Sequence, residues 1–249
     1  MIRLESVSHD YGRGPVLVNL DARIATGLVS AVCGANAAGK TTLLRIAAGL
    51  LSPTSGRVLL EDRSLTEWSL RERARRCGFM SQRFECSTGF SVRHVLRLAG
   101  LATRVRSAEE SNLLEALELG ALLDRSVGTL SSGQAQRVAF ARLLLQCPPD
   151  GVLILDEPCA ALDPRWTLIF GELLRARAAA GGTILVSIHD LGLVGQIADE
   201  VLLLAGTRLA AHAPAEEVLV ASVLSSAYQV EFDVLRTSSG GAIPISVRR

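Results

Sequence analysis

One short segment, residues 34–42 with the sequence GANAAGKTT, constrains the fold of this chain more than any other. The fixed positions of the phosphate-loop pattern G-x-x-x-x-G-K-S/T are occupied by Gly34, Gly39, Lys40 and Thr41. Small residues in such a loop allow consecutive backbone N–H groups to point at one phosphate chain, and the positive end of the following helix adds to the attraction. Because residues 28–33 form an apolar run directly before the loop, we expect a buried strand, a phosphate loop and a helix over 41–50.

Lys40 is the sole lysine of the chain, although lysine and arginine together number 26. Arginine richness can reflect the genome, but the retained lysine stands where a compact ammonium group reaches β- and γ-phosphates and a planar guanidinium is too wide. The neighbouring Thr41 hydroxyl is a candidate Mg²⁺ ligand. A chance match to the motif in an Ala/Gly-rich stretch is the alternative, and the strand pattern before the loop argues against it.

The composition limits the class of protein. A length of 249 residues suffices for one α/β domain with an inserted subdomain. The hydrophobic content of 49% is high, yet no run reaches 18 apolar residues, and the longest uncharged stretch, 24–39, includes the phosphate loop. We therefore expect a buried parallel sheet or a partner surface, no membrane span, and no signal peptide at residues 1–5.

Charge and cysteine usage narrow the class further. A net charge of +1 argues against a protein that coats nucleic acid. The cysteines are scattered and form no C-x-x-C pair, which indicates reduced thiols in the cytosol and no metal site formed by them. They are Cys33, Cys77, Cys86, Cys147 and Cys159.

Apolar strand segments alternate with helical segments along most of the chain. We expect strands at 16–20, 29–33, 57–60, 152–155, 183–188 and 201–204. We expect helices at 41–50, 69–76, 91–123 and 135–145. The alternation predicts an α/β fold with a mainly parallel sheet and an N-terminal antiparallel β part. Because 84–147 shows no strand pattern, we expect a helical subdomain inserted there between core segments 1–83 and 148–249.

A second informative motif is the segment 151–158, GVLILDEP, in which an apolar strand ends in two acids. The carboxyl ends of parallel strands face the ligand in such folds, so Asp156 is predicted to hold Mg²⁺. Glu157 is then placed to orient and deprotonate the attacking water. Hydrophobic runs before Asp-Glu are common, and the segment becomes informative only together with the phosphate loop.

The remaining motifs resemble, in order and over nearly the whole chain, those of ATP-binding-cassette (ABC) ATPases, which have a P-loop NTPase, RecA-like core. The sequence LSSGQ at 130–134, followed by QRVAFAR at 136–142, is similar to the family signature. Tyr11 matches the aromatic residue that stacks on adenine, Gln82 the Q-loop glutamine and His189 the switch histidine. Residues 161–163 match the D-loop.

This resemblance implies an ATPase that uses ATP and Mg²⁺. The nucleotide would contact Tyr11, Gly34, Asn36, Ala37, Gly39, Lys40, Thr41 and Thr42. The metal ligands would be Thr41, Gln82 and Asp156, and the catalytic residues Glu157, His189 and Gln82. The signature residues Ser131, Gly133 and Gln134 would grip the γ-phosphate bound to a second copy, so that two chains sandwich two ATP molecules head to tail.

Each of these residues also has a structural reading. Residues 130–134 alone read equally as a polar turn before a helix at 135–145. Tyr11 reads as a turn aromatic, Gln82 as an exposed polar residue and His189 as a core histidine. No chemistry is assigned to His9, His94 or His212.

The chain departs from the family pattern at several positions. Ala37 and Ser132 replace glycines, Ala35 replaces a proline, and Ala160 replaces the D-loop serine. If position 37 requires a positive φ, alanine costs about 1 kcal/mol there. Because the general motif leaves that position free, we expect the loop to form and the ATPase to be competent.

Segments 65–76, 90–92 and 218–230 resemble importers of iron-siderophore, haem and cobalamin chelates, whose tail ends in a short helix and strand. This resemblance implies that the chain lies at the cytoplasmic face of the inner membrane. Its implied partners are a transmembrane permease and an extracytoplasmic substrate-binding protein, with no nucleic acid. The arginines at 71, 73, 75 and 76 read as a solvated face or as a contact with anionic lipid.

Two alternatives from other classes remain. A non-transport ABC ATPase of DNA repair or translation would carry coiled coils or tandem cassettes, and this chain has one cassette without a heptad run. A P-loop kinase or GTPase would need neither the signature nor His189.

Overall fold

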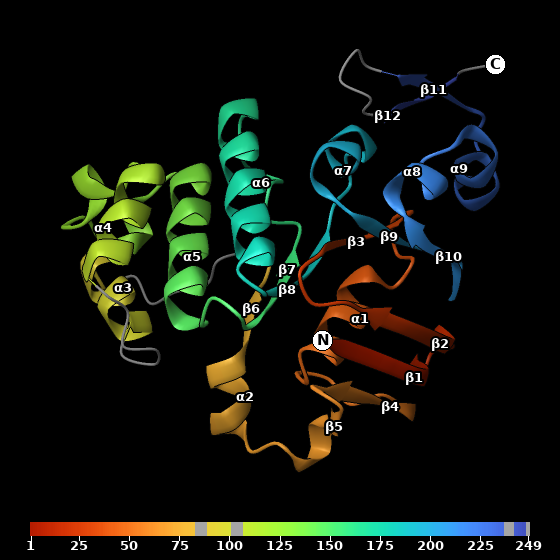
Figure 1. Cartoon of the computed structure of the whole chain (residues 1–249), viewed down its shortest axis with the longest axis horizontal. Helices are drawn as coiled ribbons and strands as arrows, with labels where there is room; N and C mark the ends of the chain where they lie inside the picture. Colours follow the sequence, from red (N-terminus) through yellow and green to blue (C-terminus); the bar gives the residue numbers. More distant parts are fainter. Residues whose placement is uncertain (83–88, 101–106, 237–241, 248–249) are drawn as a thin grey trace.

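The computed structural model describes residues 1–82, 89–100, 107–236 and 242–247. Over these residues a central six-stranded sheet has the order β10-β9-β3-β8-β7-β6 (Figure 1). Its strands are β3 (Val29–Gly34), β6 (Cys77–Met80), β7 (Val152–Asp156), β8 (Thr183–Ser187), β9 (Glu200–Ala205) and β10 (Arg208–Pro214). Neighbouring strands pair in parallel from β9 to β6, and β10 pairs antiparallel with β9. The expected mainly parallel sheet is confirmed.

Both faces of this sheet are buried, as its apolar strands predict. Along β7, Leu153 and Leu155 belong to one hydrophobic cluster, whereas Val152 and Ile154 belong to another on the opposite face. Successive strand side chains point to opposite faces, so a run without polar alternation requires cover on both sides. This burial explains the high hydrophobic content of the chain.

One face of the sheet is covered by α1 (Lys40–Ala47) and by an N-terminal antiparallel sheet in the order β2-β1-β4-β5. The strands of that sheet are β1 (Ile2–Asp10), β2 (Pro15–Ile24), β4 (Ser55–Leu60) and β5 (Arg63–Ser64). Leu43 and Leu44 of α1 join the same cluster as Ile2 and Leu4 of β1. Helix α1 is therefore held between two sheets, which fixes the loop in front of it.

The opposite face carries α5 (Ser132–Gln146), α6 (Pro164–Ala179) and α7 (Leu191–Ile197). Phe140 of α5 stacks on Phe170 of α6, with ring centroids 3.9 Å apart. Beyond α5 lie α3 (Val92–Gly100), α4 (Ser107–Ala116) and the 3-10 turns η2 (Gly120–Leu122) and η3 (Val127–Thr129) (Figure 1). Buried Arg137 connects these layers, because it donates to Leu117 O at 2.7 Å while its guanidinium lies over the Trp166 ring.

Helices occupy the stretch where the sequence predicts an inserted helical subdomain, within residues 89–100 and 107–147. The division of the chain at 84 and 147 stays a prediction, and residue 84, like Cys86, lies outside the described residues. Two boundary predictions are wrong. The stretch 91–123 is not helical throughout, because α4 ends at Ala116 and Glu118, with a positive φ of 46°, breaks the helical backbone before η2. Helix α5 begins at Ser132, three residues before the expected start at 135, so signature residues form its first turn instead of a loop before it.

Two short connecting elements, η1 (Leu65–Glu67) and α2 (Leu70–Arg76), precede β6. The chain ends in α8 (Ala215–Val218), α9 (Ala221–Tyr228) and an antiparallel hairpin of β11 (Phe232–Arg236) and β12 (Ala242–Ser246). Figure 1 shows this hairpin beside α7 and α9, at the opposite side of the molecule from α3 and α4. In the described ranges, no helix combines the length and the apolar character that a bilayer crossing requires.

Candidate nucleotide site

The phosphate loop lies at the carboxyl end of β3, which lies in the middle of the sheet between its parallel neighbours β9 and β8. Lys40 is buried, and its Nζ donates to Gly34 O at 2.8 Å and to Ala35 O at 3.0 Å. Burial lowers the pKa of Lys40 from its ordinary value, and the carboxylates of Glu157 and Asp156 act in the opposite direction. An anion in the loop would restore the environment that a buried ammonium favours.

The residue in front of α1, Gly39, has a left-handed conformation with φ of 93° and provides no side-chain cap. The first N–H groups of α1 therefore have no side-chain acceptor, which is the arrangement of an anion-binding helix terminus. Ala37 also has a positive φ, 62°, so the strain anticipated from its sequence is present. The loop forms despite this alanine.

A cluster of polar side chains stands at the end of β7. Asp156 is buried and its Oδ1 accepts from Ser187 Oγ at 2.8 Å, while Ser187 Oγ accepts from the Glu157 N–H at 2.8 Å. Glu157 has a positive φ of 49°, an uncommon conformation for a non-glycine residue that turns its side chain out of the strand direction.

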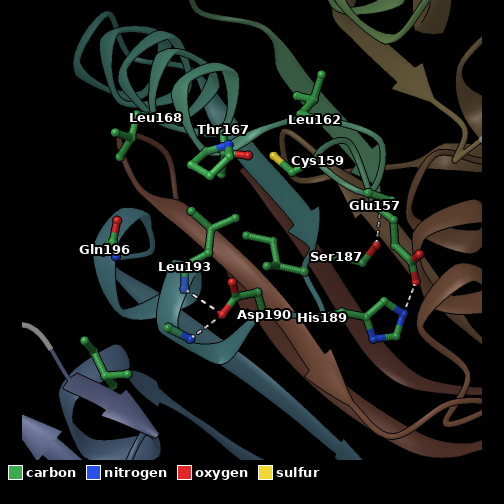
Figure 2. A pocket seen from close by; sticks show the side chains of 15 residues that line it. Glu157, Cys159, Leu162, Thr167, Leu168, Ser187, His189, Asp190, Leu193 and Gln196 are labelled. Atoms are coloured by element: carbon green, nitrogen blue, oxygen red, sulfur yellow. Dashed lines mark hydrogen bonds and ion pairs between the residues drawn. The ribbon is translucent and has the colours of Figure 1, made fainter. Parts of the chain in front are cut away.

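The Glu157 carboxylate joins the two other predicted catalytic residues. Its Oε2 accepts from Gln82 Nε2 at 2.6 Å, and its Oε1 pairs with His189 Nε2. Figure 2 shows Glu157, Ser187 and His189 turned toward one another at one end of a cavity. Residues 82, 157 and 189 come from three separate chain segments, so the fold has assembled a group that the sequence order only suggested.

A cleft of 340 Å³ connects this cluster with the phosphate loop. Glu157 and His189 line one side of it, and the other lining residues are Tyr11, Val16, Asn36, Ala37, Ala38, Gly39, Lys40, Thr41 and Thr42. Tyr11 is 53% exposed, and its ring meets the His9 ring at an interplanar angle of 79° with centroids 4.5 Å apart, so part of the ring stays open to a ligand. A helix terminus without a side-chain cap, a buried ammonium, a carboxylate and an open aromatic ring together suit a nucleoside triphosphate.

A larger cavity of 630 Å³ shares Glu157 and His189 with the cleft and extends toward α6 and α7 (Figure 2). Its walls are mainly apolar, with Leu162, Leu168 and Leu193 among them. Cys159 also lines it, and burial raises the pKa of this thiol to about 12, which keeps it protonated.

The signature residues lie elsewhere. Among the described residues that line the cleft, none comes from 131–134. Ser131 caps α5 by accepting from the Gln134 N–H at 3.3 Å, and Gln134 Oε1 accepts from the Ser131 N–H at 3.1 Å. Gly133 faces the 161–163 segment of its own chain, where an added Cβ would lie 3.1 Å from Ala161 O. The signature therefore packs beside the D-loop segment and does not reach the phosphate loop of the same chain.

Sequence reasoning missed two residues that organise this site. Ser187 contacts the Asp156 carboxylate and the backbone of Glu157, and the signal for it was a polar residue at the carboxyl end of the mostly apolar strand TILVS. Buried Gln136 donates to Pro158 O at 2.9 Å and so ties α5 to the turn after Glu157. A glutamine inside an otherwise apolar helix face was the corresponding signal.

Comparisons with known proteins agree with this geometry. A family model described as ABC transporter matches residues 17–160. The chain is 34% identical to the hemin import ATP-binding protein HmuV of Rhodopseudomonas palustris (strain HaA2), over 92% of this chain and 90% of that protein. It is 37% identical to the protein of the same name from Streptomyces coelicolor, over 96% and 86%.

Among solved structures, the chain is similar to a dimeric bacterial ABC transporter cassette, with a TM-score of 0.76 and 26% identity over 86% of this chain and 99% of that one. The family model spans more than half of the chain, and the curated relatives span nearly all of it. The chain therefore belongs to the ABC transporter family and is one of its ATPases.

Proposed function

We propose that this chain is the ATP-hydrolysing subunit of an importer for haem or a related metal chelate, and that the cleft at the phosphate loop is its catalytic site. The observation that carries the site assignment is the Glu157 carboxylate, held by Gln82 and His189 at the edge of the cleft that contains Lys40. The importer assignment rests on relatives named for hemin import.

The phosphate chain of ATP lies in the loop, and the adenine stacks on the open face of Tyr11. Lys40 Nζ exchanges its contacts with Gly34 O and Ala35 O for β- and γ-phosphate oxygens, a change that its buried position favours. Backbone N–H groups of the loop surround the β-phosphate. The residues assigned to the nucleotide are Tyr11, Gly34, Asn36, Ala37, Gly39, Lys40, Thr41 and Thr42.

The residues proposed to hold Mg²⁺ are Thr41, Gln82 and Asp156. In the described part of the chain, no cluster of three or more His, Cys, Asp or Glu side chains could hold a metal ion. A site with one carboxylate and two neutral oxygen ligands fits Mg²⁺, which keeps several waters and shares the phosphates of its substrate. When bound, the ion neutralises charge on the β- and γ-phosphate oxygens.

Glu157 acts as the general base. The attacking water forms a bond to the γ-phosphorus, the bond to the ADP oxygen breaks, and a Glu157 carboxylate oxygen takes the proton of the water. Gln82 and His189 each contact one oxygen of this carboxylate and so orient it. Ser187 fixes the peptide N–H of the same residue.

A second copy of the chain completes the site. Ser131, Gly133 and Gln134 do not line the cleft of their own chain, so the γ-phosphate they contact is that of a partner. The similarity to a cassette solved as a dimer supports this arrangement. For transport, the chain binds a transmembrane permease at the cytoplasmic face of the inner membrane. An extracytoplasmic substrate-binding protein delivers the chelate to that permease, and no step involves nucleic acid.

Transport assays test the proposal. The chain is reconstituted with a permease that co-purifies with it, and ATP-driven uptake of haem, a ferric siderophore and cobalamin is compared. We expect uptake of one of the three chelates, lost in Glu157→Gln. ATP hydrolysis that is neither stimulated by a permease nor dependent on one would contradict the importer assignment. Uptake that continues in Glu157→Gln would contradict the assignment of the catalytic site.

A further inference from the structure

Tyr228 ends α9, far along the chain from the phosphate loop, yet its hydroxyl contacts the first residue of that loop. The Gly34 N–H donates to Tyr228 Oη at 3.1 Å across a sequence separation of 194 residues. None of the roles proposed above uses this tyrosine. The sequence marks it only as part of the importer-like tail.

Gly34 is the residue at which β3 ends and the loop begins, and it is buried. Its φ of 147° and the 2.5 Å that would separate an added Cβ from Leu204 O show that β9 confines it on one side. Its carbonyl accepts from Lys40 Nζ, and its N–H donates to Tyr228. Both backbone polar groups of Gly34 are therefore held by side chains, one from the loop itself and one from the tail.

Apolar packing holds the Tyr228 ring within the tail. The Tyr228 ring packs against Phe232, with centroids 5.6 Å apart, and Leu224 of the same helix is fully buried. Ser225 Oγ accepts from the Phe232 N–H at 2.9 Å, a separate hydrogen bond between α9 and β11 that involves neither Tyr228 nor Gly34. Burial, with a smaller effect of Cys33, raises the pKa of the Tyr228 phenol, so the hydroxyl stays neutral.

The chain has two tyrosines, and the hydroxyls of both contact the segment 34–42. Tyr11 Oη lies 3.3 Å from Thr42 Oγ1, at the end of the segment that enters α1. Tyr228 Oη contacts Gly34 at the other end. The two contacts bracket the loop, and they differ in kind: Tyr11 presents its ring to the cleft, whereas Tyr228 offers only an acceptor to the backbone.

We propose that Tyr228 is a positioning residue for nucleotide binding, whose hydroxyl fixes Gly34 and makes the C-terminal tail a structural part of the phosphate site. If the hydroxyl is removed, the buried Gly34 N–H loses its acceptor and the start of the loop is free to shift away from the geometry that binds phosphate. The inference rests on the phosphate-binding role proposed for residues 34–42. Because the contact is with the backbone of the loop, the loss falls on the phosphate chain and not on the base.

Tyr228→Phe tests this proposal, because it removes the hydroxyl and keeps the ring against Phe232. We expect the variant to bind ATP and inorganic tripolyphosphate about three- to tenfold more weakly, by the same factor for both ligands. Ser225→Ala is the matched control, since it removes another hydrogen bond of the tail without touching Gly34. The affinities of Ser225→Ala for both ligands should stay within about twofold of the parent, even if its melting temperature falls as much as that of Tyr228→Phe.

Lys40→Ala separates the two hypotheses in the same assay. If Lys40→Ala leaves tripolyphosphate affinity unchanged, the phosphate site itself is wrong. If Lys40→Ala abolishes binding while Tyr228→Phe binds like the parent, only the role of Tyr228 is wrong. The role of Tyr228 would also be overturned if Ser225→Ala lost as much affinity as Tyr228→Phe, or if Tyr228→Phe lost affinity for ATP but not for tripolyphosphate.

A measurement on the parent protein covers the case in which Tyr228→Phe does not fold. Amide hydrogen exchange should show the Gly34 N–H strongly protected without nucleotide, because its acceptor belongs to the protein. Exchange of that amide at the rate of an exposed loop amide would contradict the contact and the proposal.

Discussion

Helices α1 and α5 both follow a small residue and both present backbone N–H groups, but only α5 is capped by side chains. Gly39 offers α1 no side-chain acceptor, whereas Ser131 and Gln134 form a reciprocal capping box at the start of α5. The first turn of α1 therefore gains hydrogen-bond partners when an anion binds, while the first turn of α5 is already partly satisfied. The difference suggests that α1 provides nucleotide affinity and that α5 provides a preformed surface for nucleotide held elsewhere.

The surroundings of the two helix ends support this division. The loop before α1 opens into the cleft that contains Glu157 and His189. The start of α5 instead packs Gly133 against the Ala161 carbonyl of its own chain. Four predictions, each with its own control variant, test how the two helix ends differ.

Glu157→Gln should have the largest effect. A glutamine keeps the volume and one acceptor but takes no proton, so turnover should fall by about 10²- to 10⁴-fold while ATP still binds. The ATP-bound closed state should then accumulate as a dimer in Mg·ATP, with the protein monomeric in its absence. Phosphate release and light scattering measure the two effects.

The control for that dimer is a second substitution at the start of α5. Adding Ser132→Arg should abolish the dimer and leave ATP binding to the monomer intact, because the bulky side chain obstructs only the surface offered to a partner. A dimer that survives Ser132→Arg, or parental turnover in Glu157→Gln, would refute the division of roles between the two helices.

Lys40→Arg should come next, with nucleotide affinity lowered on the order of 100-fold, and Lys40→Ala should be at least as severe. The guanidinium keeps the charge but does not fit where Nζ reaches Gly34 O and Ala35 O. Arg45→Lys on the exposed side of the same helix is the matched control and should bind normally. Titration with a fluorescent ATP analogue measures all three, and an affinity of Lys40→Arg within about twofold of the parent would contradict the point-charge role.

These residues also show how far the sequence predicts the site. The phosphate loop and the acids at the end of β7 follow from local patterns, an apolar strand followed by a fixed motif, and the structure places the loop and Glu157 at one cleft. Ser187 was missed because its role depends on β8 lying beside β7. Tyr228 was missed because α9 meets the loop only in the folded chain. The start of α5 was misplaced although Ser131 and Gln134 have the spacing of a capping box, a signal that the polar composition of the segment concealed.

Ser131→Ala should have a moderate effect confined to α5. Loss of the cap costs about 1 kcal/mol of folding free energy, because the Gln134 N–H loses its acceptor. ATP affinity of the monomer should not change, since α1 lies outside the affected turn. Chemical denaturation of Ser131→Ala and of Ser131→Asp, which retains a capping oxygen, measures the difference. Equal stability of the two variants would show that the cap is not formed in solution.

Ala37→Gly should have the smallest effect and an unusual sign. Ala37 holds a left-handed backbone, so glycine relieves about 1 kcal/mol of strain, which its greater freedom in the unfolded chain partly offsets. Ala38 is buried and is absent from the described positive-φ residues, so Ala38→Gly lacks this relief and should destabilise by about 1 kcal/mol. Opposite signs in parallel denaturation curves would show that the loop before α1 carries backbone strain in the absence of ligand, whereas α5 begins unstrained and capped. If both glycines destabilise equally, Ala37 is not strained, and the contrast between the two helix ends reduces to the cap alone.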